Sequence, residues 1–164
     1  MYEDHTSGSV SDKLKKVTEM KIQIEEPLTS EDFERYYDLR WRILREPWNQ
    51  PRGSERDDRE DRSTHIIARI EDKIIAVGRV HFNSDVEAQV RYMAVESKHQ
   101  GRGFGSLLLK ELEKKAREKG AKYIVLNARE NATAFYEKNG YKKIDKAPTL
   151  FGRVEHWKML KDLG

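Results

Sequence analysis

Apolar residues recur in the first part of this chain with two different periods, which predict a strand and then a helix. Alternating apolar and polar residues at positions 20–24 predict a short first strand. Thr29 or Ser30 can cap the helix that follows, because the first turn after them is acidic. Its apolar positions, at helical spacing, are Phe33, Tyr36, Tyr37, Trp41 and Leu44. Pro47 ends this helix.

The middle of the chain alternates polar segments with strand-forming runs. A loop with alternating charge covers residues 47–63, and loops of that length often serve a function. Short turns at residues 71–73 and 83–85 separate the runs that come next. The predicted strands cover residues 64–70, 74–82 and 87–96.

The last part predicts a helix, a strand, a short helix and two strands. A 3.6-residue apolar period indicates a helix over residues 103–119, which Gly120 stops. The apolar face of that helix contains Phe104, Leu107, Leu108, Leu112 and Ala116. The later elements cover residues 123–126, 131–139, 141–144 and 154–160. This mixed order predicts an α/β fold around one central sheet.

Length and composition agree with one globular domain. A chain of 164 residues is long enough for a single domain with a full-sized core. Hydrophobic and charged residues each make up 37% of the chain, which excludes the low hydrophobicity of a disordered protein. Residues 1–18 are polar and predict a flexible leader, so the domain is expected to cover residues 19–164.

Residue usage excludes several kinds of site and partner. The chain has no cysteine, which excludes disulfides, thiolate metal sites and cysteine nucleophiles. Its histidines lack metal-ligand spacing, so no metal is expected. No apolar run approaches the roughly 20 residues that span a bilayer, and no secretory signal is visible, so we expect a cytoplasmic protein without a membrane partner. The net charge of +3 is mild, and basic residues do not interleave with aromatic ones, so no nucleic acid is expected.

A strand that runs into a glycine-rich turn and then into a helix carries the clearest chemical signal. The turn reads Gln100-Gly101-Arg102-Gly103-Phe104-Gly105-Ser106. Glycines let a backbone approach a ligand closely, and the N–H groups at a helix start bind phosphate. The turn lacks the Gly-Lys-Ser/Thr ending of a P-loop and the full Gly-x-Gly-x-x-Gly spacing of a dinucleotide fold. Taken alone, it is compatible with a phosphate site or with a structural turn.

Two motifs together resemble the GCN5-related N-acetyltransferase (GNAT) family. Gln100-x-x-Gly103-x-Gly105 at a strand-to-helix turn resembles its pyrophosphate motif, and Ala-Thr-Ala-Phe-Tyr-Glu-Lys-Asn-Gly-Tyr at residues 132–141 resembles its C-terminal motif. The resemblance covers residues 20–160 and implies a single domain with a mixed, mostly antiparallel sheet that is splayed in the middle and flanked by helices. The chain is most similar to the ElaA-like branch, on Leu39-Arg40, Arg45-Glu46-Pro47, His65, Leu126-Asn127-Ala128-Arg129, His156 and Met159.

The resemblance implies an enzyme that transfers an acetyl group from acetyl-coenzyme A (acetyl-CoA), as co-substrate, to a primary amine by direct attack. The backbone of residues 93–95 is expected to contact pantetheine and the thioester, and the glycine-rich turn to hold the pyrophosphate. Tyr136 occupies the position of the family's general acid, since a phenol can protonate a forming thiolate; packing is the alternative role of its ring. The implied cofactor-binding residues are Met93, Ala94, Val95, Gln100, Gly101, Arg102, Gly103, Phe104, Gly105, Ser106, Asn131 and Phe135.

The general base is less clearly marked by the sequence. Gln89 stands where some members of the family carry a glutamate, and an amide cannot accept the proton. Glu87 lies on the same face of an ideal strand and is predicted to act through water, unless it is an ordinary solvated carboxylate. His156 could bind substrate, act as a base or simply be hydrogen-bonded within its strand. Arg129 replaces an asparagine that many members carry, which affects one contact on the pantetheine side.

Two tryptophans are candidates for a substrate pocket. Trp41 fits a core position better, and Trp48, in a loop, fits a pocket wall. The acceptor can be a small-molecule or a protein amine, and a homodimer stays open. Besides an active N-acetyltransferase, the sequence leaves a non-catalytic acyl-CoA-binding sensor as the alternative, since no base is obvious.

Overall fold

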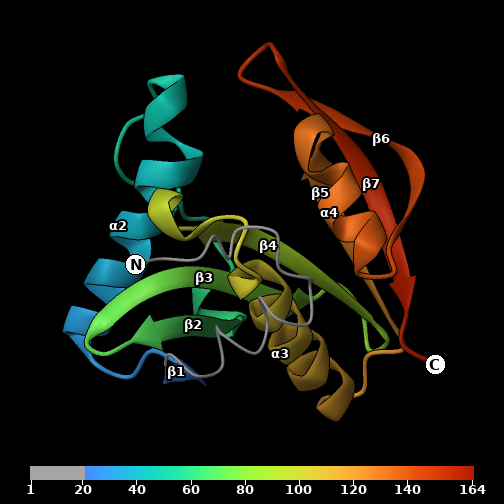
Figure 1. The fold of residues 1–164 in the computed structure, drawn as a ribbon. Coiled ribbons are helices and arrows are strands. Elements are labelled where there is room, and N and C mark those ends of the chain that lie inside the picture. Colours follow the sequence, from blue (N-terminus) through green and yellow to red (C-terminus); the bar gives the residue numbers. More distant parts are fainter. Residues whose placement is uncertain (1–20) are drawn as a thin grey trace, which may run out of the picture.

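The computed structural model describes residues 21–164, whose strands form one seven-stranded sheet (Figure 1). The leader predicted over residues 1–18 lies outside the described residues. The strands are β1 (Ile22–Glu25), β2 (Thr64–Ile70), β3 (Lys73–Phe82), β4 (Glu87–Val95), β5 (Tyr123–Arg129), β6 (Lys142–Leu150) and β7 (Val154–Asp162). Their order in the sheet is β1-β2-β3-β4-β5-β7-β6, and β4 with β5 is the parallel pair. The other pairs are antiparallel, which confirms the predicted mixed sheet.

Three α-helices accompany the sheet in the described part of the chain. They are α2 (Ser30–Leu44), α3 (Phe104–Glu118) and α4 (Thr133–Lys138), and short 3-10 turns lie at Glu46–Trp48, Glu60–Arg62, Ser97–His99 and Glu130–Ala132. Helix α2 begins where predicted, because Thr29 Oγ1 accepts a hydrogen bond from the Asp32 N–H at 3.0 Å. It ends at Leu44, and Pro47 lies in the 3-10 turn that follows.

Helices α2 and α3 pack on opposite faces of the sheet. Tyr36 and Leu39 of α2 join a small buried cluster with Val77 and Ala94 of the sheet. The larger cluster lies on the other face and contains the buried apolar residues of α3, which are Phe104, Leu108, Leu109, Leu112 and Ala116. The sequence pattern placed Leu107, and not Leu109, on the apolar face of this helix. In the structure Leu109 is buried and Leu107 is only partly buried. The larger cluster supplies most of the buried apolar surface and therefore most of the driving force for folding.

Three other expectations need correction. Trp41 is half-buried instead of lying in the core, and its indole N–H donates to the Gln50 carbonyl at 3.0 Å. Strand β5 continues to Arg129 instead of ending at residue 126, because β7 pairs with it along its whole length. Strand β6 likewise reaches Leu150 because β7 pairs with it. Local sequence does not reveal such long-range pairing.

The parallel strands β4 and β5 separate after a short paired region. They are in register at three positions, Glu87 with Tyr123, Ala88 with Ile124 and Gln89 with Val125, and they diverge beyond Gln89. Figure 1 shows the resulting opening in the middle of the sheet, with β5, β6, β7 and α4 on one side and the other strands on the other. This opening confirms the predicted splay, and it leaves one backbone edge of β4 without a strand partner.

A β-bulge lies in β4 next to the opening. Arg79 of β3 pairs with Arg91 and Val77 pairs with Ala94, so Tyr92 and Met93 together face the single residue Gly78. Tyr92 has a left-handed φ of 60°, which is unusual for a residue with a side chain. The extra residue reverses the alternation of side chains along the strand. Val90 before the bulge and Met93 after it therefore both pack toward the α3 side.

Candidate active site

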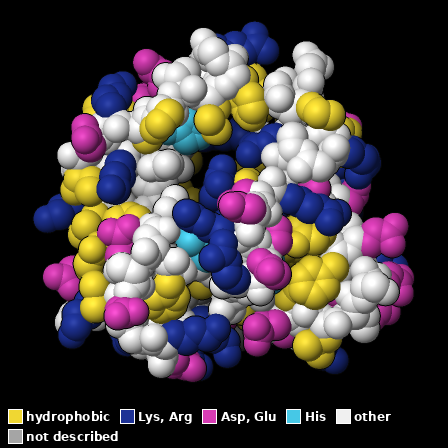
Figure 2. All heavy atoms as spheres, turned by 180° about the vertical axis from the view of Figure 1, so that it is seen from behind, with side chains coloured by type: hydrophobic (Ala, Val, Ile, Leu, Met, Phe, Trp, Pro, Cys, Tyr) yellow, Lys and Arg dark blue, Asp and Glu magenta, His cyan; other side chains and the backbone are white. Residues whose placement is uncertain are grey.

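A cleft of about 360 Å³ lies in the opening between β4 and β5. The strands, the end of α2, the start of α4 and the β6–β7 hairpin all contribute to it. Its lining residues are Leu44, Arg45, Gln89, Val90, Arg91, Tyr92, Met93, Leu126, Asn127, Ala128, Arg129, Ala132, Tyr136, Pro148, Leu150 and His156. Figure 2 views the molecule from behind Figure 1 and shows basic side chains and histidines around a hollow near the middle of that face. The splay of the sheet thus creates a polar, cationic cavity inside the domain.

The glycine-rich turn adopts a conformation that only glycine reaches easily. Gly101 and Gly103 have φ values of 76° and 91°, and Gly103 is the residue that caps α3. Within α3 the hydrogen-bond ladder begins at Leu107, whose N–H donates to the Gly103 carbonyl at 3.1 Å. The N–H groups just before it therefore have no partner within the helix, and the helix dipole adds positive potential there. These features make the turn suitable for a phosphate group.

Several side chains of the turn are used within the protein. Gln100 Nε2 donates to the Val95 carbonyl at 3.0 Å, which ties the turn to the end of β4. Phe104 is buried in the main core, so its backbone is the part of it that can meet a ligand. Arg102 lies beside His99, with 3.4 Å between Arg102 Nη1 and His99 Nδ1. The turn therefore offers a ligand chiefly its backbone.

The two sequence motifs meet in space although about 30 residues separate them. A Cβ atom placed on Gly105 would lie 3.1 Å from the Phe135 ring, so the glycine makes room for that ring. Asn139 Nδ2 donates to Ser106 Oγ at 3.3 Å and links the end of α4 to the start of α3. The rings of Phe135 and Tyr136 are 5.0 Å apart and meet edge to face. Phe135 therefore connects the turn to Tyr136.

Tyr136 presents a protonated phenol to the cleft. Burial raises the pKa of this hydroxyl to about 12, while the positive charge of Arg129 acts in the opposite direction. Among the described residues the hydroxyl has no hydrogen-bond partner, so its proton is available to a ligand. The group can therefore donate a proton at neutral pH, and Arg129 favours the phenolate that would form.

His156 lines the same cleft from β7. Its Nδ1 lies 2.9 Å from the Val154 carbonyl, and a carbonyl can only accept, so Nδ1 carries the proton. Nε2 is then the nitrogen with a free lone pair. Burial lowers the pKa of this imidazole, and the nearby positive charges of Arg129 and Arg45 lower it further. His156 is therefore neutral at pH 7 and able to accept a proton.

Glu87 is placed differently from His156 and does not line the main cleft. Its carboxylate accepts hydrogen bonds from the Tyr123 hydroxyl at 3.1 Å and from Asn83 Nδ2 at 2.7 Å. It borders a smaller hollow that shares Gln89 with the main cleft. Asn131, another predicted site residue, is exposed in the 3-10 turn before α4.

Three arginines, Arg45, Arg91 and Arg129, form one side of the cleft and are called the arginine wall here. Arg129 Nη2 donates to the Leu44 carbonyl at 2.9 Å, which links β5 to the end of α2 across the opening. Among the described residues no aspartate or glutamate lines the cleft. The cavity therefore has a strong positive potential, which favours an anionic group in a ligand.

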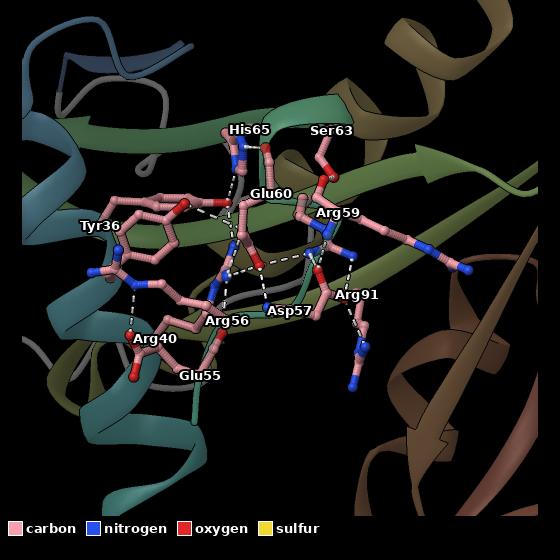
Figure 3. A network of polar contacts seen from close by, with 12 residues as sticks. Tyr36, Arg40, Glu55, Arg56, Asp57, Arg59, Glu60, Ser63, His65 and Arg91 are labelled. Atoms are coloured by element: carbon pink, nitrogen blue, oxygen red, sulfur yellow. Dashed lines mark hydrogen bonds and ion pairs between the residues drawn. The ribbon is translucent and has the colours of Figure 1, made fainter. Parts of the chain in front are cut away.

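A buried ionic network lies beneath the arginine wall (Figure 3). Glu60 accepts hydrogen bonds from Arg40 Nη1 at 3.0 Å and from Arg79 Nη1 at 2.7 Å, and both guanidinium groups are fully buried. Asp57 binds Arg79 at 2.6 Å and Arg91 at 2.9 Å. Sequence reasoning missed this network, although the acidic residues of the 47–63 loop were a signal for it. Through Asp57 the loop holds one member of the arginine wall in place.

Two aromatic rings from distant segments meet near the cleft. Trp48, in the 3-10 turn after α2, stacks on Phe151 at the tip of the β6–β7 hairpin, with 6.3 Å between ring centroids. The Arg45 guanidinium lies 5.3 Å from the Phe151 centroid, and Arg129 lies 5.9 Å from that of Trp48. Trp48 was expected at a pocket wall, whereas Phe151 had no sequence signal. The pair joins the two sides of the opening.

Residues 21–164 contain no group of histidine and acidic side chains that could hold a metal ion. No helix in that part of the chain is long and apolar enough to cross a membrane.

Comparison with known proteins gives a consistent result. The model of the acetyltransferase (GNAT) family matches residues 33–141. The chain is 32% identical over 114 residues to the uncharacterized N-acetyltransferase YjcF of Bacillus subtilis, covering 70% of this chain and 81% of the relative. It is 31% identical over 116 residues to the [ribosomal protein bS18]-alanine N-acetyltransferase of Haemophilus influenzae, covering 70% and 77%.

Solved structures share the fold at low sequence identity. A putative N-acetyltransferase from Lactobacillus plantarum has a TM-score of 0.77 at 21% identity, over 87% of this chain and 99% of that one. An aminoglycoside 6'-N-acetyltransferase complexed with coenzyme A has a TM-score of 0.73 at 18% identity, over 85% of this chain and 96% of that one. ElaA of Escherichia coli has a TM-score of 0.71 at 16% identity, over 87% of this chain and 99% of that one. ElaA is therefore one of several similar structures, and the comparisons do not favour it specifically.

Proposed function

The chain belongs to the GNAT family of acetyltransferases, and from that premise we propose that it transfers the acetyl group of acetyl-CoA to an amine held in the cleft between β4 and β5. The observation that carries this proposal is the meeting of the glycine-rich turn and Tyr136 through Phe135. A cofactor whose pyrophosphate binds at the turn can extend along the unpaired edge of β4 toward the Tyr136 hydroxyl. The acceptor is a small-molecule or protein amine, and the ElaA-like branch stays a proposal based on residues alone.

We assign the cofactor contacts by their position along that path. The backbone N–H groups of residues 101–106 bind the pyrophosphate, supported by the left-handed glycines and the helix start. The backbone of Met93, Ala94 and Val95 binds the pantetheine arm, since β4 has no strand partner on this edge beyond Gln89. Phe135 packs beside the arm, and exposed Asn131 borders its outer end. Gln100 positions the turn through its bond to Val95.

The chemistry needs one proton acceptor and one proton donor. The neutral amine attacks the thioester carbon, a C–N bond forms, and the C–S bond breaks as the thiolate leaves. Tyr136 gives its proton to the thiolate, and the positive charge of Arg129 favours the transient phenolate. His156 Nε2 takes the proton of the amine. We prefer His156 to Glu87 as the base because His156 lines the cleft and is neutral, whereas Glu87 lies at its border.

Binding of acetyl-CoA should stabilise the folded protein. At a ligand concentration of about 100 Kd, the gain is about 2.7 kcal/mol, or roughly 5–10 °C in Tm for a domain of this size. Free adenosine should give a far smaller shift, because the pyrophosphate is the anchor. Gly103→Val should lose the shift, because its side chain obstructs the approach of the phosphate to the backbone.

Gly120→Val is the matched control for this experiment. Gly120 also has a left-handed φ, of 103°, but it lies at the other end of α3. The strain of a valine should therefore lower the Tm of the ligand-free protein in both variants, while only Gly103→Val loses the shift. An unchanged shift in Gly103→Val would show that the turn is structural.

The pH dependence of kcat/KM should separate the two candidate bases. Burial keeps the pKa of His156 below its usual 6.5, so this base is active at neutral pH and its contribution is lost as pH falls through that lowered pKa. His156→Gln should remove this inflection and lower kcat/KM about 10²-fold, the lower end for general base catalysis, because part of the amine is already neutral. Glu87→Gln should keep the inflection. If Glu87→Gln removes it instead, the base is Glu87.

A further inference from the structure

We propose that the acceptor is a small primary amine that also carries an oxyanion, which Arg45 and Arg129 bind. This inference rests on the proposed function, because it assigns the substrate class of the same cleft. The oxyanion is a carboxylate, as in an amino acid, or a phosphate, and both match the planar fork of a guanidinium group.

The first observation is that Arg45 and Arg129 have no anionic partner within residues 21–164. Arg45 is only 7% exposed, and it donates to the carbonyls of Ser54 at 3.0 Å and Leu44 at 3.2 Å. Arg129 also donates a hydrogen bond to the Leu44 carbonyl. Burial lowers the pKa of both guanidinium groups, because each is desolvated without a carboxylate to compensate. Arg45 is buried and Arg129 is half-buried. Desolvated charges are normally paired, so these two are suited to an anion from a ligand.

The neighbouring network shows the contrast within the same protein. Arg40 and Arg79 are fully buried, and each binds an acidic side chain from the 47–63 loop (Figure 3). Where arginines only support the fold, the chain thus supplies carboxylates. For Arg45 and Arg129 it supplies backbone carbonyls instead, which position both groups and leave other N–H donors of each open. Arg91, the third arginine of the wall, is paired with Asp57.

The cofactor does not account for these two charges. The phosphates of acetyl-CoA belong at the glycine-rich turn, and the pantetheine arm and thioester that enter the cleft are uncharged. A polycationic acceptor fits poorly too, because no acidic side chain of residues 21–164 lines the cleft. The acceptor must therefore bring the negative charge itself.

The volume of the cleft and the positive electrostatic field inside it both fit a small acceptor. A volume of about 360 Å³ is near the lower limit for ligand pockets, and the acetyl end of the cofactor occupies part of it. The same positive field favours the neutral form of the bound amine, which is the form that attacks.

The test compares matched amines that differ in the oxyanion. One pair is β-alanine and β-alaninamide, and the other is phosphoethanolamine and ethanolamine, with kcat/KM expressed per free-base amine. In at least one pair the anionic member should be preferred by at least about 10-fold. Arg45→Gln and Arg129→Gln should each lower its kcat/KM by roughly 10–100-fold, since hydrogen bonds to charged groups are the stronger class. For Arg45→Gln the uncharged member should change by less than about 3-fold. Arg129→Gln should lower the uncharged member as well, because Arg129 also favours the Tyr136 phenolate, and it should lower the anionic member more.

Two controls make the result specific. Arg117→Gln removes an exposed arginine from the far part of α3 and should leave both members of each pair unchanged. Arg45→Lys keeps the charge but loses the fork, so it should recover only part of the loss for a carboxylate. The acetyl-CoA shift in Tm, measured on each variant, shows that the fold and the cofactor site are intact.

The outcomes separate this inference from the proposed function. If uncharged amines are acetylated as fast as their anionic partners, or if Arg45→Gln lowers both equally, the inference is wrong and the acetyltransferase assignment stands. If acetyl-CoA binds but no amine of either kind is acetylated, the proposed function fails, and this inference fails with it. A preference for phosphate over carboxylate, or the reverse, identifies the source of the oxyanion.

Discussion

Replacing Tyr136 by phenylalanine is expected to lower turnover by about 10²–10⁴-fold, the usual weight of general acid catalysis. The substitution keeps the ring that packs on Phe135 and removes only the hydroxyl. Because burial raises the pKa of this phenol to about 12, the group stays protonated throughout the usual assay range. Affinity for acetyl-CoA should change little, since the anchor lies at the turn. Steady-state kinetics measure the turnover, and the Tm shift on adding acetyl-CoA measures the binding.

Tyr123→Phe is the matched control for Tyr136→Phe. It removes the hydroxyl that donates to Glu87 at 3.1 Å, outside the main cleft, and should leave turnover nearly unchanged. The proton-donor role would be refuted by full activity in Tyr136→Phe together with loss in Tyr136→Ala. That pattern would mean that the ring packs against the cofactor and carries no proton.

Replacing Glu60 by glutamine is expected to destabilise the fold by about 3–5 kcal/mol, the usual cost of removing one partner from a buried ion pair. Glutamine keeps the shape of the side chain but leaves the fully buried Arg40 and Arg79 with less negative charge. Chemical denaturation of the ligand-free protein measures the change, as a lower midpoint at an unchanged m-value.

Glu31→Gln provides the comparison for Glu60→Gln. Glu31 pairs with Arg35 at 2.6 Å on the surface, where its side chain is 70% exposed, and exposed pairs contribute less than about 1 kcal/mol. A loss below about 1 kcal/mol in Glu60→Gln as well would show that the network is not important for stability. Its role would then be limited to holding the 47–63 loop.

Most of the fold could be predicted from local sequence because local interactions decide it. Thr29 caps α2 with its own side chain, and Gly103 and Gly120 bound α3 with left-handed backbone. The bulge at Tyr92 had no such signal, because pairing between β3 and β4 creates it. The extensions of β5 and β6 depend on β7 in the same way.

The candidate site likewise contains residues that could be predicted from the sequence and residues that could not. The glycine-rich turn and Tyr136 lie in contiguous motifs, so the sequence displays them. The arginine wall combines the end of α2 with β4 and β5, and each arginine alone resembles any surface charge of a chain with 37% charged residues. Desolvation and the missing carboxylates distinguish Arg45, which is buried, and Arg129, which is half-buried, and both properties depend on the tertiary structure.

Because β4 and β5 are paired at only three positions, the cleft is fixed at one end of the two strands and open at the other. Three residue pairs join the strands at the paired end, while one hydrogen bond from Arg129 and the Trp48–Phe151 stack cross the opening itself. Helix α3 also contacts the side of the opening that carries β5, β6, β7 and α4, through the Asn139–Ser106 and Tyr141–Glu113 hydrogen bonds. A small rotation about the paired end of β4 and β5 displaces their open end most. Widening the opening to release product therefore costs far less free energy than separating two fully paired strands, and the paired end can remain intact through each catalytic cycle.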